Sequence, residues 1–105
     1  MPTYDVCRSE QLVEGRGRPG RAGDRYIAVF RVADRLFALD NQCVHVGSPI
    51  DGGPVLDGKV LCPWHGWTYE LETGDLVTAL GNQPGLSSYR AWEEGGMVKV
   101  HIANG

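Results

Sequence analysis

The sequence predicts an all-β domain built from antiparallel hairpins. Its 105 residues include 15 glycines and 6 prolines, so the chain needs many turns. Between these turns lie short runs of β-branched and aromatic residues, and no window of a dozen residues has a clear 3.6-residue period. At this length we expect one domain over residues 1–105.

Three pairs of strands around short turns carry this pattern, with one further strand after the second pair: residues 26–32 with 35–39, 55–56 with 59–61, then 67–71, and 86–92 with 97–102. Asp57-Gly58 is a strong signal for a two-residue hairpin turn. In the last strand, apolar residues alternate with Lys99 and His101, which is typical of a half-buried strand.

A glycine-rich segment, residues 14–23, precedes the first hairpin and carries Arg16, Arg18 and Arg21. Its composition predicts a flexible, solvated loop, with partner docking or anion binding as the alternative role.

Composition narrows the class of protein. The net charge is −3, which lacks the strong basic footprint of a nucleic-acid-binding protein. The sequence contains no stretch of about 18 apolar residues, so we expect no membrane span. The N-terminus lacks the basic region and the apolar region of a secretory signal. The three cysteines do not suit a secreted disulfide framework. We therefore expect a cytoplasmic protein that binds neither nucleic acid nor membrane.

Two short segments each contain one cysteine and one histidine. Cys43 and His45 form the first pair, Cys62 and His65 form the second, and sixteen residues lie between the two pairs. A zinc site also uses two cysteines and two histidines, but its cysteines usually share one loop. Mixed loops suit a two-iron cluster in which one iron takes both cysteines and the other takes both histidines.

The spacing Cys-x-His, sixteen residues, Cys-x-x-His resembles the signature of the Rieske family, over about residues 26–102. The surrounding matches are Gly47, Cys62-Pro63, Gly66 and Tyr69-x-x-x-Thr73-Gly74. The resemblance implies one [2Fe–2S] cluster on Cys43, His45, Cys62 and His65.

The family fold implied is a β-sandwich-like base with a small cluster-binding subdomain, about residues 41–68, formed by two loops. Gly47 and Gly66 would let backbone N–H groups approach the inorganic sulfides closely. Pro84 resembles part of a loop that covers the cluster in the family, with a plain turn as the alternative.

Three residues depart from the Rieske proteins of respiratory complexes. Ser48 and Trp64 stand where those proteins have a disulfide, and Trp67 stands where they have a serine hydroxyl. Tyr69 matches a family tyrosine that donates to a cysteine sulfur. With fewer hydrogen bonds to sulfur, we expect a potential in the lower part of the Rieske range, around −150 mV or somewhat above.

The resulting hypothesis is a one-electron carrier with no turnover of its own, passing electrons from a flavoprotein reductase to a terminal oxygenase. The motif also resembles the small Rieske subunit of nitrite reductase, which would make the partner a larger reductase subunit. A zinc-stabilised structural module is the alternative from another class.

Overall fold

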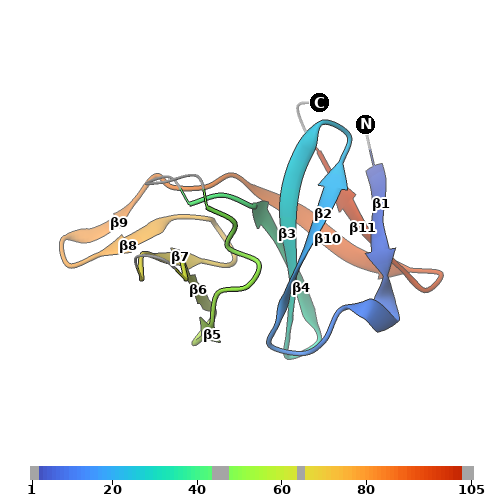
Figure 1. Cartoon of the computed structure of the whole chain (residues 1–105), viewed down its shortest axis with the longest axis horizontal. Helices are drawn as coiled ribbons and strands as arrows, with labels where there is room; N and C mark the ends of the chain where they lie inside the picture. Colours follow the sequence, from blue (N-terminus) through green and yellow to red (C-terminus); the bar gives the residue numbers. More distant parts are fainter. Residues whose placement is uncertain (1–2, 44–47, 64–65, 103–105) are drawn as a thin grey trace.

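The computed structural model describes residues 3–43, 48–63 and 66–102, which form two antiparallel sheets (Figure 1). The larger sheet, the base, has the strand order β1-β11-β10-β4-β3-β2. Its strands are β1 (Thr3–Arg8), β2 (Gly17–Ala22), β3 (Arg25–Val32), β4 (Arg35–Asp40), β10 (Ser88–Glu94) and β11 (Met97–His101). A 3₁₀ turn, η1 (Ser9–Gln11), follows β1.

The smaller sheet has the order β5-β6-β7-β8-β9, in which every strand pairs with its neighbour along the chain. Its strands are β5 (Val55–Leu56), β6 (Lys59–Leu61), β7 (Thr68–Glu70), β8 (Leu76–Thr78) and β9 (Gly81–Gln83). This sheet is inserted between β4 and β10, so the chain leaves the base once and returns to it once.

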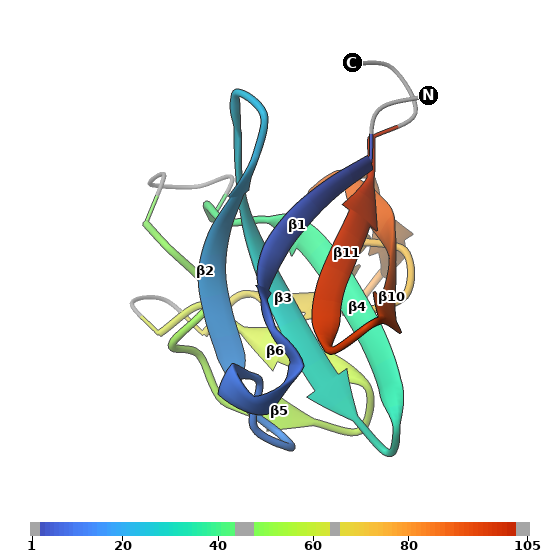
Figure 2. The same cartoon turned by 90° about the vertical axis from the view of Figure 1, so that its right-hand side faces the viewer.

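The base sheet is rolled, so that its two edge strands β1 and β2 lie side by side (Figure 2). Gly20 on β2 permits this contact, because a Cβ there would overlap Cγ1 of Val6 on β1. The roll encloses one apolar core, which contains Ile27, Val29 and Val100.

Strand β3 is buried on both faces. Ile27 and Val29 point into the rolled base, whereas Ala28 and Phe30 belong to a second core that reaches the small sheet. Successive side chains of a strand point to opposite faces, so an unbroken apolar run implies a strand covered on both sides. β3 therefore joins the two halves of the molecule.

The three hairpins expected from the sequence are confirmed. Their turns hold pairs of residues with positive φ, as two-residue turns of the mirror-image type require: Ala33 and Asp34, Asp57 and Gly58, Gly95 and Gly96.

The expectation of a flexible loop over residues 14–23 is wrong for most of that segment, because β2 pairs with β3 from Gly17 to Ala22. Arginine, glycine and proline have low strand propensity, but β2 is an edge strand, where proline is tolerated. Gly17 is needed for packing, since a Cβ there would overlap the Asp51 carbonyl oxygen and the Phe30 ring.

The β8–β9 hairpin was not expected from the sequence. Its strands have three residues each, too few to show an alternating pattern. The small sheet consequently runs to Gln83.

Candidate metal centre

The two loops that begin at Cys43 and Cys62 are closed in the same way. The Cys43 N–H donates to the Ser48 carbonyl at 2.7 Å, and the Cys62 N–H donates to the Trp67 carbonyl at 2.7 Å. In each case a cysteine bonds to the fifth residue beyond it. The fold thus presents two matched loops, each starting with a thiol.

Both thiols are buried, at 1% exposure each, in the core that lies between the two sheets. The Tyr69 hydroxyl lies 3.3 Å from Cys43 Sγ, and the tyrosine side chain is fully buried. A metal-bound thiolate only accepts hydrogen bonds, so in that state Tyr69 is the donor. Two shielded sulfurs, one of them beside a fixed donor, suit the thiolate half of a metal–sulfur site.

Asn41 closes the neck of the first loop and has almost no exposed surface, at 1%. Its Oδ1 accepts from the N–H groups of Ile50, at 2.7 Å, and Asp51, at 3.0 Å. Its Nδ2 donates to Asp51 Oδ1 at 2.9 Å, and its own N–H donates to the Tyr26 carbonyl. One side chain therefore joins the chain before Cys43 to the chain after the loop.

The first loop is in turn joined to the second. Leu61, which precedes Cys62, donates its N–H to the Pro54 carbonyl at 3.0 Å. Gly53 crosses so close to Leu61 that a Cβ would overlap the Leu61 carbonyl oxygen. The segment from Asp51 to Pro54 consequently links the position of Cys43 to that of Cys62.

Gly66 takes part in the turn that follows Cys62. Its φ of +70° is the conformation that favours glycine, and its N–H donates to the Cys62 carbonyl at 2.9 Å. No described atom lies within 4 Å of an added Cβ. Glycine at this position therefore suits the backbone conformation of the turn after Cys62.

Other residues singled out from the sequence flank the two thiols. Trp67 is partly buried and packs against the core that contains both cysteines, while Ser48 is half-buried. Pro84 is exposed, and its neighbour Gly85 lies against Tyr69, since a Cβ there would be 3.2 Å from the ring. The predicted residues His45, Gly47, Trp64 and His65 lie outside the described part of the chain.

Cys7 belongs to a different environment. It is buried in the core of the base, apart from the core that holds the other two cysteines, and burial raises the pKa of its thiol. A thiol that is harder to ionise is a poor metal ligand. The structure thus separates Cys7 from the pair that the motif selects.

Asn41 is the functional residue that sequence reasoning missed. It lies just before the Cys-x-His motif, and among the described residues it is the buried polar side chain of the core. A single asparagine has no diagnostic spacing, so its role appears only when its bonding partners are known.

A small β domain that presents two buried thiols from two matched loops is typical of a metal–sulfur protein. Residues 2–90 match the Rieske [2Fe-2S] domain, and this chain belongs to that family. Its cofactor is accordingly a [2Fe–2S] cluster, which excludes the zinc module that the ligand pattern left open.

Similar proteins differ greatly in size. The anthranilate 1,2-dioxygenase ferredoxin subunit of Burkholderia cepacia is 43% identical over 81 residues, which cover 77% of this chain and 74% of that protein. Apoptosis-inducing factor 3 of Mus musculus is 32% identical over 88 residues, or 84% of this chain, but the chain spans only 14% of that relative's length.

The fold has a counterpart in a solved complex of reduced oxygenase and oxidized ferredoxin in carbazole 1,9a-dioxygenase. The similarity has a TM-score of 0.79 and 26% sequence identity, and covers 94% of this chain and 92% of that one. Among the described residues, no helix is long and apolar enough to cross a bilayer.

Proposed function

We propose that this protein is a one-electron carrier that passes electrons from a flavoprotein reductase to a terminal oxygenase. The main support is the similarity to the anthranilate 1,2-dioxygenase ferredoxin subunit. The chain is 43% identical to that protein over most of both lengths. The solved complex pairs a ferredoxin with an oxygenase, and a chain of that complex has this fold. These relatives favour the shuttle over the nitrite reductase subunit.

We further propose that Cys43 and Cys62 bind one iron and that His45 and His65 bind the other. The matched closure of the two loops and the shared burial of the two thiols support the cysteine half of this assignment. The histidine half rests on the spacing of the motif. When bound, the cluster takes up and releases one electron.

The surrounding residues have separate tasks in this function. Asn41 and Asp51 hold the first loop closed, and Gly53 keeps the second loop in contact with it. Ile50 and Leu71 are buried in the same core as the thiols and help to exclude water from that core. Tyr69 donates to Cys43 Sγ, which stabilises negative charge on that sulfur.

Two residues support a potential in the lower part of the Rieske range for the proposed carrier. Trp67 has no hydroxyl to donate to a sulfide, and Ser48 cannot form a disulfide. The expected potential is around −150 mV or somewhat above, within a family range that extends to roughly +300 mV. A measured potential above about +200 mV would contradict this assignment.

Ligand assignment is tested by replacing each proposed ligand in turn. Cys43→Ser, His45→Ala, Cys62→Ser and His65→Ala should each lose the visible absorption of the cluster and the EPR signal of its reduced form. Cys7→Ala is the matched control, because its thiol lies in the other core, and it should keep both signals. Retention of the mixed-ligand EPR signal in a histidine variant would contradict the assignment.

The electron-transfer role is tested with purified components of the anthranilate dioxygenase system. The dithionite-reduced protein should be oxidised by the oxygenase component, and the oxidised protein should be reduced by NADH and the reductase component. Failure of both reactions, with the cluster intact, would contradict the proposed shuttle. A cytoplasmic location is part of this proposal, and it is checked by fractionating the cells that produce the protein.

A further inference from the structure

The part of the chain that holds the two cysteines is strongly acidic. Residues 36–89 run from β4 through the small sheet to the start of β10, and they contain six acidic residues against one basic residue, Lys59. The segments 1–35 and 90–105 contain the other nine basic and seven acidic residues. The net charge of −3 is therefore divided into −5 for residues 36–89 and +2 for the rest.

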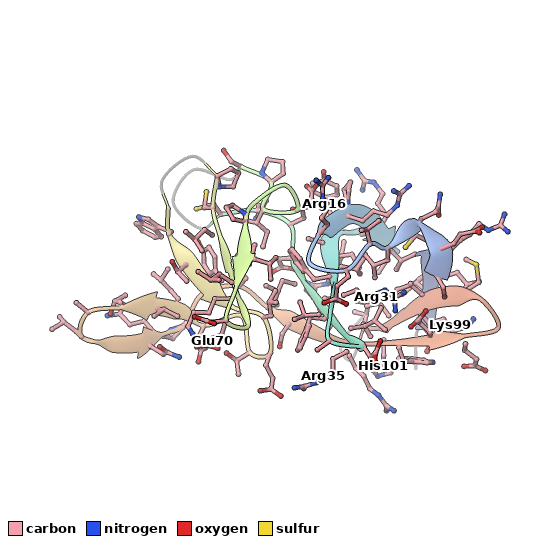
Figure 3. All side chains as sticks on the ribbon, turned by 90° about the horizontal axis from the view of Figure 1, so that it is seen from below. Arg16, Arg31, Arg35, Glu70, Lys99 and His101 are labelled. Carbon is pink, nitrogen blue, oxygen red and sulfur yellow. The ribbon has the colours of Figure 1, made fainter. Side chains whose placement is uncertain are left out.

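The cations of the base are apart from most of this negative charge. Figure 3 shows the labelled Arg16, Arg31, Arg35 and Lys99 on the base and the labelled Glu70 on the small sheet. Glu70 and Glu72 each have a cation beside them, because Lys59 lies 3.9 Å from Glu70 and Arg35 lies 2.9 Å from Glu72. These two carboxylates are thus partly neutralised.

Asp57 and Asp75 lie at the end of the small sheet that is remote from Cys62. Strand β6 runs from the Asp57 turn toward Cys62, and β7 runs back from the second cysteine loop to the turn that contains Asp75. The two turns are adjacent, since the Leu71 N–H donates to the Gly58 carbonyl. Of the six acidic residues, Asp40 and Asp51 remain as candidates to act on the thiols.

Asp40 and Asp51 flank the first cysteine loop. Asp40 ends β4, three residues before Cys43, and three residues of extended chain span at most about 11 Å. Asp51 follows Ser48 by three residues, and the Ser48 carbonyl accepts from the Cys43 N–H at 2.7 Å. Both carboxylates therefore belong to the neck of the loop that begins with the Cys43 thiol.

Both carboxylates are half-buried and held by hydrogen bonds from neutral donors. Asp40 Oδ1 accepts from the Tyr89 hydroxyl at 2.6 Å, and its Oδ2 accepts from the Ser87 N–H at 3.3 Å. Asp51 Oδ1 accepts from Asn41 Nδ2 at 2.9 Å. Neutral donors fix the position of a carboxylate but leave its net charge in place.

No cation contacts either carboxylate. Among the described residues, no lysine or arginine nitrogen lies within 4.0 Å of Asp40 or Asp51. Arg25 reaches Asp40 only through Tyr89, to whose hydroxyl it donates at 3.0 Å. Arg16 lines the same groove as Asp51 and is exposed to water, which screens its charge. Two fixed negative charges thus stand beside the first loop without direct compensation.

We propose that the carboxylates of Asp40 and Asp51 lower the reduction potential of the cluster electrostatically. Uptake of one electron makes the site more negative by one charge, and nearby negative charge disfavours that state. The thiols are buried, so the interaction passes partly through protein rather than through water alone. The inference rests on the proposed ligands and electron-carrier function, and it adds a second cause of a low potential besides the missing hydrogen bonds to sulfur.

The test is protein-film voltammetry of the cluster-containing protein. Asp40→Asn and Asp51→Asn each remove one charge and keep an oxygen acceptor, and each should raise the potential. A charge about 10 Å away should change the ratio of reduced to oxidised protein at a fixed electrode potential roughly threefold. This corresponds to about 30 mV, because tenfold is 59 mV for one electron. The double variant should show about the sum of the two shifts.

Two further variants separate charge near the loop from other effects. Asp34→Asn makes the same chemical change on the turn before β4, roughly 20 Å from Asp40 along the strand. Asparagine tolerates the positive φ of 66° at this turn, and the variant should shift the potential less than half as much. Asp40→Glu keeps the charge while altering the hydrogen bonds, and it should stay close to the parent potential. All variants should keep the visible and EPR spectra of the parent.

Unchanged potentials in Asp40→Asn and Asp51→Asn would overturn the inference. It would also be overturned by equal shifts in Asp34→Asn and Asp40→Asn, which would indicate an effect of overall charge. A rise in Asp40→Glu as large as that in Asp40→Asn would assign the effect to hydrogen bonding instead. A parent protein without a reversible one-electron couple would contradict the proposed function itself, whereas a reversible couple with unshifted variants would contradict only the role of these carboxylates.

Discussion

Asn41 and Asp51 form a side-chain pair across the neck of the first cysteine loop, with Asn41 Nδ2 donating to Asp51 Oδ1 at 2.9 Å. The same asparagine accepts from two backbone N–H groups through Oδ1. Since the segment after Asp51 contacts the residue before Cys62, this pair affects the relative position of both thiols.

The first prediction concerns this pair. Asn41→Asp keeps an acceptor for the two backbone N–H groups but replaces the donor to Asp51 by a second carboxylate. Because two carboxylates repel, we expect the loop to open more easily. A chelator should then remove the cluster from the folded variant at least several-fold faster than from the parent protein. The double variant Asn41→Asp with Asp51→Asn restores a donor opposite the acceptor and should recover much of the parent rate. Asp51→Asn alone keeps an acceptor for Asn41 and should resemble the parent.

Val98→Ala provides the comparison for the Asn41 variants, because it removes buried volume from the core of the base without touching the loops. It should lower the free energy of unfolding by roughly 1–3 kcal/mol and leave the rate of cluster removal unchanged. An Asn41→Asp protein that loses its cluster to the chelator at the parental rate would contradict the role of the pair.

The second prediction concerns Tyr69 and Cys43. Tyr69→Phe removes the hydroxyl 3.3 Å from Cys43 Sγ and should lower the reduction potential, because the donor stabilises the reduced, more negative state. A hydrogen bond of about 0.5–1.5 kcal/mol corresponds to roughly 20–65 mV for one electron. Protein-film voltammetry measures the shift, and Tyr4→Phe, in the base, should show none.

The third prediction compares two neighbouring glycines. Gly53→Ala would place a Cβ against the Leu61 carbonyl oxygen, whereas Gly52→Ala would meet no atom within 4 Å. We expect the first variant to lose about 1–3 kcal/mol of unfolding free energy, as overpacking does, and to release its cluster faster. Gly52→Ala should match the parent in both measurements, and equal losses in the two variants would contradict the close crossing.

The fourth prediction concerns acid stability of the base. The hydrogen bonds from the Arg31 guanidinium lower the pKa of Glu93 from 4.5 to about 2. A carboxyl whose folded pKa is depressed adds stability that is present above its unfolded pKa and is lost as the pH falls through the folded value. Glu93→Gln should therefore be less stable than the parent at pH 7.

The stability difference between the parent protein and Glu93→Gln should shrink as the pH falls from about 4.5 toward 2, measured by urea unfolding. Glu72→Gln is the control, because its ion pair with Arg35 is exposed and should contribute little at any pH. A difference between parent and Glu93→Gln that does not vary with pH would contradict the coupling of Glu93 to Arg31.

Local patterns were sufficient for the hairpins and for the ligand motif. Paired turn residues such as Asp57-Gly58 determine a two-residue turn through their backbone preferences, which need no distant partner. The spacing of Cys43, His45, Cys62 and His65 resembles the Rieske signature, which implies the cluster type, and the family match agrees with that cofactor. The sequence by itself therefore determined the all-β class, the kind of cofactor and the electron-transfer hypothesis.

The tertiary structure decided what depends on contacts between distant segments. Strand β2 exists because Gly17 and Gly20 let a chain of low strand propensity pack against Asp51 and Val6. Asn41 became a positioning residue only through partners nine and ten residues away. Such contacts depend on non-local packing, which cannot be inferred from local composition.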